Sequence, residues 1–334
     1  MLSRRTRATL AASLLLATSA SAQNAFRPLP SVPDALEWSG TAPRPVPSLA
    51  SYMDELERAA DAPRPTSFLE ARGYLDAAGS AGLEGGGDVS HQRGGWQVIF
   101  GTELDEERLA AFSLSTEAHF YNFGGGPNLV PGASEPFNDL YRASFSGIVR
   151  TPQQLGMGWF GGFEFTLGGE DEASPRDALV AGGVGGVHYV ASERLEVDVG
   201  LAMLSRLEDD PWIWPFLGLK WRASDALTFE AKGTSVEARY ALDPTWSLFA
   251  RAEYQLRQFR LNDNNPLPGG VFRDEEIRAG AGVTHRSESG FKLDLFGGLN
   301  VWRELSTLDS VGTKVRESEA DTAPFVALSL QLSV

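Results

Sequence analysis

The sequence predicts an all-β fold, a transmembrane antiparallel up-and-down β-barrel of 14 strands, with 12 as the alternative count. Three observations lead to this prediction. Apolar and polar residues alternate over long runs, short and long connections take turns between the runs, and aromatic residues recur where runs meet short turns. A soluble exported β-sandwich is the competing fold, because a period of two is common to both architectures.

The alternating runs are too long for an ordinary soluble sheet. In 194–206, RLEVDVGLAMLSR, an apolar residue occupies every second position from Leu195 to Met203. The same pattern recurs in 246–257 and 291–301. Each run has about 9–14 residues, which suits a tilted strand that crosses a bilayer. Strands of soluble proteins are usually about half as long.

The connections alternate in length, as expected when all tight turns lie on the periplasmic side of a barrel. Short turns are expected at 104–107, 153–156, 192–193, 224–225, 243–244 and 288–290, and long connections at 79–93, 123–138, 169–177, 207–211, 262–270 and 306–322. Two consecutive short turns fit this rule if 226–242 forms two short strands with a turn near Gly233. One bent strand there would give 12 strands instead of 14.

Six aromatic residues lie next to the short turns and share the parity of the apolar face of their own strands. They are Trp159, Tyr189, Trp221, Tyr240, Trp246 and Phe291. Aromatic rings favour the boundary between membrane and water. We therefore expect these residues to form an aromatic girdle on the outer face of the barrel.

The last run alternates apolar and small or polar residues from Val326 to Val334. In a soluble protein such a strand would be an exposed edge that invites aggregation. In a barrel the last strand pairs with the first, and no edge remains. We expect the barrel to comprise residues 67–334.

The first 66 residues differ from the rest. Residues 1–22 combine early arginines, a short apolar run and a small-residue site near Ala22, which is typical of a secretory signal peptide. Residues 23–66 are rich in proline and include an expected amphipathic helix at 49–61. This segment is expected either to plug the barrel or to lie in the periplasm.

Composition excludes several classes of protein. The chain has no cysteine, which excludes disulfide-stapled folds and thiol catalysis. Its formal net charge of −15 argues against a nucleic-acid partner, because phosphates attract basic surfaces. After the first 22 residues no apolar stretch approaches the length of a transmembrane helix.

Charged residues of both signs occupy the alternate strand positions that are expected to point into the lumen. They are Arg142, Arg150, Glu164, Glu196, Asp198, Arg206, Lys220, Arg222, Glu230, Lys232, Glu237, Arg239, Arg251, Glu253, Arg257, Arg278, Arg286, Lys292 and Asp294. On the lipid face a charge would cost about 2–4 kcal/mol near the midplane. In the lumen the same groups either line a selective pore or fill a closed barrel with salt bridges.

Three stretches resemble an uncharacterised family of signal-bearing bacterial outer-membrane β-barrel proteins. They are ARYALDPTWSLFARAEYQLRQFRLNDN, EEIRAGAGVTHRSESGFKLDLFGGLNVWREL and the closing strand. The resemblance implies the fold and a location in the outer membrane of a Gram-negative-type bacterium, and it implies no activity. The ending also resembles the assembly signal of such barrels, although it stops at Val334 where an aromatic residue is usual.

The sequence favours a passive channel or uptake pore for small solutes. A closed barrel with a structural or surface-interaction role is the first alternative. The second is a lipid-modifying enzyme at the rim, for which His285 and Ser287 are the candidates. No third carboxylate is placed to orient His285, so we expect no enzyme, no catalytic or metal site and no cofactor. The expected partners are outer-membrane lipid, the barrel-assembly machinery during insertion and a small solute.

Overall fold

The structure, a computed structural model, describes residues 67–105, 108–125, 129–133, 135–151, 155–287 and 289–333. The expected signal peptide, the Pro-rich segment and the helix at 49–61 lie outside these residues. Within the described ranges, no helix is long and apolar enough to cross a membrane.

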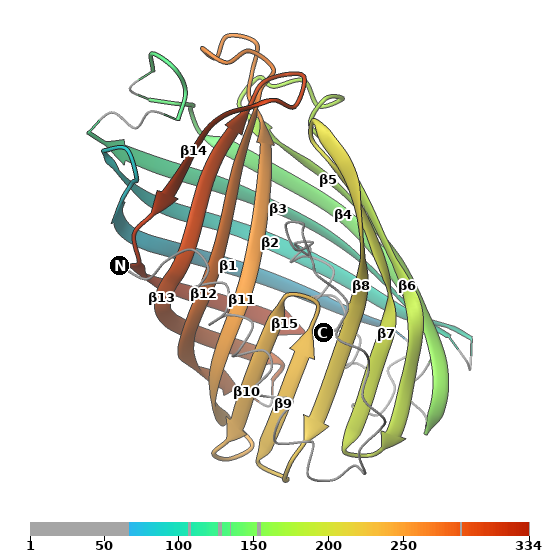
Figure 1. Ribbon diagram of the computed structural model, residues 1–334. Helices are drawn as coiled ribbons and strands as arrows, with labels where there is room; N and C mark the ends of the chain where they lie inside the picture. Colours follow the sequence, from blue (N-terminus) through green and yellow to red (C-terminus); the bar gives the residue numbers. More distant parts are fainter. Residues whose placement is uncertain are drawn as a thin grey trace, which may run out of the picture. The chain divides into compact units, whose positions relative to one another are not determined.

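The described chain forms one 15-stranded sheet (Figure 1). Its strands are β1 (Ser67–Gly82), β2 (Asp88–Asp105), β3 (Arg108–Gly124), β4 (Leu140–Arg150), β5 (Gly156–Glu170), β6 (Leu179–Ser192), β7 (Leu195–Arg206), β8 (Asp209–Arg222), β9 (Leu227–Lys232), β10 (Ser235–Ala241), β11 (Trp246–Arg260), β12 (Val271–Arg286), β13 (Phe291–Leu308), β14 (Lys314–Ala320) and β15 (Ala323–Ser333). Most are long enough to cross a bilayer, as the alternating runs predict.

The sheet closes on itself through its first and last strands. β15 pairs with both β1 and β13, so Leu328 lies opposite Leu75 on one side and Leu295 on the other. β14 pairs with β13 beyond the end of β15 and continues the same position in the wall. The result is a closed antiparallel 14-strand β-barrel, which confirms the predicted fold class and strand number.

The barrel has two distinct ends. β1 begins and β15 ends at the same end, which we call the terminal end. The tight connections at 193–194 and 242–245 also lie there. The opposite end, which we call the loop end, carries the connections at 125–139 and 261–270. This is the arrangement that the alternation of turn lengths predicts.

β9 and β10 are much shorter than the other strands of the wall. They form a hairpin whose turn is at Gly233, in the left-handed region with φ 53°, and Thr234. β8 pairs with β9 only from Gly218 to Arg222, and the pairing of β10 with β11 extends only as far as Glu253. Figure 1 shows the hairpin ending well below the tops of β8 and β11.

Above this hairpin, β11 bends inward while it stays paired with β12, and its end reaches β5 on the opposite side of the barrel. Arg260 at the end of β11 pairs with Gly169 of β5, in parallel. A Cβ atom on Gly168 would lie 2.6 Å from the carbonyl oxygen of Gln258. Glycine at 168 therefore allows the two backbones to touch, and the loop-end half of the lumen is divided by β11.

The loop-end part of β6–β8 overlaps the back of the strands that moved inward. Val271 of β12 and Leu308 of β13 form a buried cluster with Leu207, which joins β7 to β8, and Val180 of β6 packs against it. Leu256 of β11 shares the parity of the exposed Leu248, and yet only 6% of it is exposed. At this height the wall is therefore held by side-chain packing instead of a ladder of hydrogen bonds.

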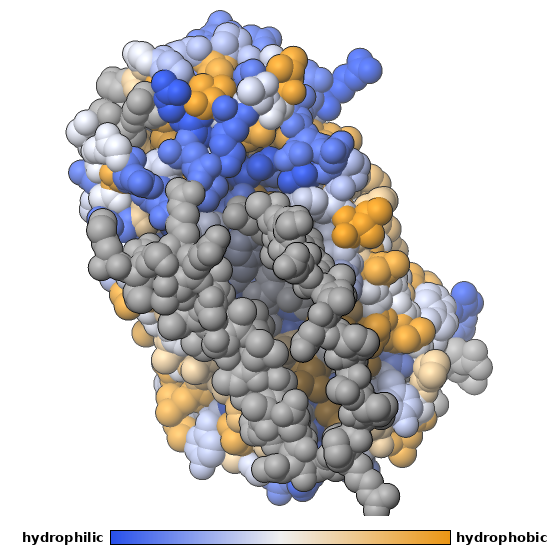
Figure 2. All heavy atoms as spheres, in the orientation of Figure 1, coloured by the Kyte–Doolittle hydropathy of each residue, from blue (hydrophilic) through white to orange (hydrophobic). Residues whose placement is uncertain are grey.

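The outer face of the strands is apolar. Ile213, Leu217, Val326 and Leu332 are each more than half exposed. Figure 2 shows hydrophilic residues gathered at the loop end and hydrophobic residues along the strands below them. Of the aromatic residues expected at the membrane boundary, Trp159, Tyr189, Trp221, Tyr240 and Trp246 are exposed, and Phe291 is half-buried.

Three expected long connections are wrong. At 306–322 the chain is mostly strand, because β13 runs to Leu308 and β14 spans Lys314–Ala320. At 79–93 the chain is mostly strand, because β1 runs to Gly82 and β2 begins at Asp88. At 207–211 only Leu207 and Glu208 connect β7 to β8. Asp209 pairs with Arg206 at 2.7 Å and already belongs to β8.

The outward face predicts a clear contrast between neighbouring positions of β15. Leu330→Arg should lower the free energy of unfolding by about 2–4 kcal/mol, because Leu330 is 44% exposed on the outer face and the charge would face lipid. Ser329→Arg is the matched control, because Ser329 lines the interior and Leu330 does not, and it should change the free energy much less. Urea unfolding in lipid vesicles measures both. Equal costs at the two positions would contradict the assignment of faces.

Candidate functional site

The interior of the barrel holds a charged cavity of about 390 Å³. Residues from β1 to β4, β8 to β13 and β15 line it. Its basic residues are Arg72, Arg93, Arg142, Lys220, Lys232, Arg239, Arg251, Arg257, Arg278, Arg286 and Lys292, and its acidic residues are Asp76, Glu117, Glu230, Glu237, Glu253 and Asp294. The lining is thus strongly basic although the whole chain carries a formal net charge of −15.

Near the terminal end, ion pairs run from strand to strand around the cavity. Glu237 of β10 accepts from Arg239 at 2.7 Å and from Arg251 of β11 at 2.6 Å. Lys292 and Asp294 of β13 pair at 2.7 Å. Such pairs keep charged side chains inside a lipid-embedded wall, because the lumen offers partners that lipid does not.

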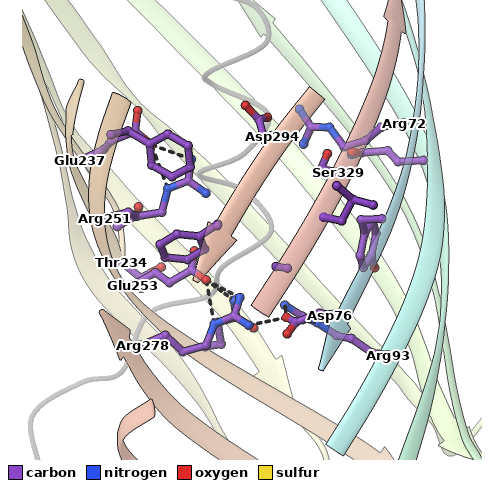
Figure 3. A pocket seen from close by; sticks show the side chains of 18 of the residues that line it. Arg72, Asp76, Arg93, Thr234, Glu237, Arg251, Glu253, Arg278, Asp294 and Ser329 are labelled. Carbon is purple, nitrogen blue, oxygen red and sulfur yellow. Dashed lines mark hydrogen bonds and ion pairs between the residues drawn. The ribbon is translucent and has the colours of Figure 1, made fainter. Parts of the chain in front are cut away.

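Arg278 is the centre of the ion pairs halfway up the lumen. Figure 3 shows its guanidinium between Glu253 of the neighbouring β11 and Asp76 of β1, with hydrogen bonds to both carboxylates. Arg93 of β2 donates to the same Asp76 at 2.8 Å. Asp76 of β1 therefore links β2 to β12 across the interior.

A second, fully buried set of charges lies on the loop-end side of Arg278. Arg257 of β11 contacts Asp274 at 3.1 Å and Glu276 at 2.7 Å, both on β12. Arg303 of β13 donates to Asp274 at 2.9 Å, and the Tyr121 hydroxyl donates to Asp274 at 2.7 Å. Each of these charged groups has partners of opposite sign, as buried charges require.

Beyond these charges, apolar side chains fill the loop end between β1–β4 and β11–β14. Val89, Leu140, Phe259, Phe272 and Leu305 belong to one buried cluster. Leu129 from the connection between β3 and β4 completes it. Among the described residues, packing therefore occupies the axial route from the cavity to the loop end.

A different apolar surface covers the inner face of β4–β8. Trp214 and Phe216 of β8 belong to a buried cluster with Phe160 of β5, and Trp212 packs against it. The rings of Phe160 and Phe216 meet edge to face with centroids 5.6 Å apart. The interior therefore has a charged half and an apolar half.

The structure brings most of the sequence-predicted charges to the cavity and leaves six outside its lining, namely Arg150, Glu164, Glu196, Asp198, Arg206 and Arg222. Arg150 pairs with Glu196 at 3.0 Å, and Glu164 lies 3.5 Å from Arg142. Arg72, Tyr74 and Asp76 also line the cavity, and they alternate in β1 with the same period of two as the predicted charges of the other strands.

The residues considered for catalysis are separated from the cavity. The His285 ring packs against Trp246 with centroids 4.6 Å apart, and the hydroxyl of Ser287 lies 2.8 Å from that of Ser289. Neither residue lines the cavity. Within the described ranges, no group of His, Asp or Glu side chains is arranged to hold a metal ion.

No family model matches the chain, and no curated protein matches it. Among solved structures, it is similar to a mutant of the TodX monoaromatic hydrocarbon channel (9% identity, TM-score 0.46, covering 83% of this chain and 92% of that one). It is also similar to an outer membrane channel from Pseudomonas putida F1 (9%, 0.44, covering 82% and 97%) and to LpxR from Salmonella typhimurium (9%, 0.34, covering 79% and 99%).

Arg278→Met should destabilise the barrel by about 3–5 kcal/mol, because it leaves the buried carboxylates of Asp76 and Glu253 without their shared cation. Arg194→Met is the control. Its pair with Asp225 at 3.2 Å is exposed and should contribute less than about 1 kcal/mol. Urea unfolding in vesicles compares the two variants, and a cost below that of Arg194→Met would show that the interior charges are not coupled.

Proposed function

We propose that this protein is an outer-membrane channel that passes small solutes by passive diffusion and prefers anions. The proposal includes insertion by the barrel-assembly machinery after removal of a signal peptide near Ala22. The cavity with its excess of arginine and lysine carries this proposal, because a positive lining attracts anions and repels cations.

The location follows from the two faces of the wall. Exposed apolar side chains such as Leu217 and Leu332 cover the outside, and the ion pairs lie within. Lipid is the solvent that fits the outside, because water would leave a large apolar surface exposed. The exposed aromatic residues near the terminal end suit the boundary with the periplasm.

A closed barrel with a structural role is the second candidate. The packing of Phe259, Phe272 and Leu305 at the loop end favours it, because these side chains occupy the axial route. The two functions differ in a simple observable. A channel lets solute cross a membrane that contains the purified protein, and a closed barrel does not.

The ion selectivity of the reconstituted full-length protein tests the proposal. Across a potassium chloride gradient, the reversal potential should indicate preference for chloride. Replacing Lys220 and Lys232 together by glutamine should move the reversal potential toward zero, because both cations line the cavity.

Lys314→Gln is the control, because Lys314 lies in β14 near the loop end, is half exposed and does not line the cavity. It should leave the reversal potential unchanged. Silence over many insertions would support the closed barrel, and cation preference in the unaltered protein would contradict the role given to the lining.

A further inference from the structure

The loop-end half of β8 is an edge inside an otherwise closed sheet. Its pairing with β9 ends at Gly218, and Gly233 donates its backbone N–H to Leu217 just above. From Asp209 to Phe216, β8 has a strand partner only on the side of β7, as far as the described residues show. A long unpaired edge is avoided in a lipid-embedded wall, so this one calls for a functional explanation.

This edge lies at the height of the lipid. On the same stretch of β8, the outward Ile213 and Leu217 are 65% and 63% exposed. Their partners on β7, Met203 and Val199, are also exposed. From Trp221 to Ile213, β8 measures about 26 Å at about 3.3 Å per residue, which at a tilt of about 40° covers about 20 Å of an apolar band about 25 Å tall. The edge therefore occupies the loop-end half of the band.

The surface behind the edge is apolar. Trp212, Trp214 and Phe216 alternate with the lipid-facing residues and point inward from the edge strand. Trp214 and Phe216 are 6% and 4% exposed and join the cluster that covers the inner face of β4–β8. An apolar group that passes the edge from the lipid would therefore meet aromatic rings before any charge.

The lower border of this gap in the pairing leads into the cationic cavity. The tip of the β9–β10 hairpin supplies Lys232, Thr234 and Ser235 to the cavity lining, and Tyr254 of β11 lines it from the other side. Figure 3 shows Thr234 next to Glu253. The apolar surface and the charged cavity thus adjoin at the hairpin tip.

The upper border is closed by polar contacts between the β7–β8 turn and the back of β11 and β12. Glu208 pairs with Arg260 at 2.7 Å, and Asp209 pairs with Arg273 at 3.2 Å. The backbone N–H of Leu207 donates to Gln258 at 3.0 Å. These contacts hold the overlapping part of the wall against β11 without strand pairing, so it can separate without breaking a ladder.

We propose that an amphiphilic organic anion passes sideways through the wall between β8 and β11. This inference rests on the proposed channel function and names its solute class. When the wall parts, the apolar body of the solute inserts among Trp212, Trp214 and Phe216, which pack in or against a buried cluster while the wall is closed, and its anionic head enters the cavity at Lys232. The packed loop end supports the sideways route, because apolar side chains occupy the axial one.

A reducible cross-link across the upper border tests the route. The chain has no cysteine, so Glu208→Cys with Arg260→Cys introduces the only thiols. A bis-methanethiosulfonate linker should slow the uptake of octanesulfonate into proteoliposomes by about tenfold or more, and reduction should restore it. Ser90→Cys with Asn122→Cys is the control pair, because β2 and β3 are already paired there, and its cross-link should have no effect.

Methanesulfonate, which has the same head and almost no apolar body, separates the two proposals. If neither sulfonate enters through the unaltered protein, the channel function fails. If methanesulfonate enters but the cross-link leaves octanesulfonate uptake unchanged, the sideways route is wrong and the channel function stands. Octanesulfonate uptake no faster than that of methanesulfonate would overturn the assigned solute class.

Binding gives a second readout that requires no transport and no cross-link. Trp214→Ala should weaken octanesulfonate binding to the protein in nanodiscs by about tenfold, because it removes an aromatic contact for the apolar body. Trp221→Ala removes the same side chain from the outward face of the same strand and should leave the dissociation constant unchanged. Equal effects of the two variants, or no effect of either, would contradict the assigned surface.

Discussion

One requirement dominates this structure. Backbone N–H and C=O groups must find hydrogen-bond partners where there is no water. A sheet meets that requirement in lipid only by closing on itself. The alternation of side chains then fixes which residues meet lipid and which meet the lumen, because successive residues of a strand point to opposite faces. The apolar ending of the chain, the inward charges and the exposed aromatic residues all follow from this one constraint.

The wall departs from the constraint at one place, and the departure shapes the interior. Because β9 and β10 are short, β8 and β11 have no common neighbour above Thr234. β11 instead crosses to β5, where Gly168 and Gly169 permit backbone contact. The same crossing places Phe259 in the packed loop end and leaves the apolar surface of β4–β8 on the other side. A short hairpin therefore produces both the closed axis and the edge in the wall.

Local features of the sequence predict much of this fold and of the charged cavity. Gly233 marked the turn that decides between 14 and 12 strands, and the parity of Arg278, Glu253 and Glu237 pointed to the lumen. The crossing of β11 was not predictable, because residues about 90 positions apart in the chain meet there and no local pattern records it. For the same reason Leu256 looks lipid-facing in the sequence but is buried under the overlapping strands. The long connection expected at 207–211 is wrong because Glu208 and Asp209 pair with Arg260 and Arg273, which come from strands distant in the sequence.

The central claim is that the wall can part along the loop-end half of β8, where no strand pairing joins β8 to β9 among the described residues. Single spin labels at each position from 209 to 222, in a chain without other cysteines, measure it directly through collision with oxygen in the bilayer and with an aqueous nickel reagent. From 218 to 222 the account predicts that accessibility alternates strictly. Spin labels at outward positions should collide with oxygen, and spin labels at inward positions should collide with the nickel reagent. From 212 to 217 it predicts oxygen access at both parities. Strict alternation along the whole strand would contradict the account, because it would mean that the wall is sealed at β8.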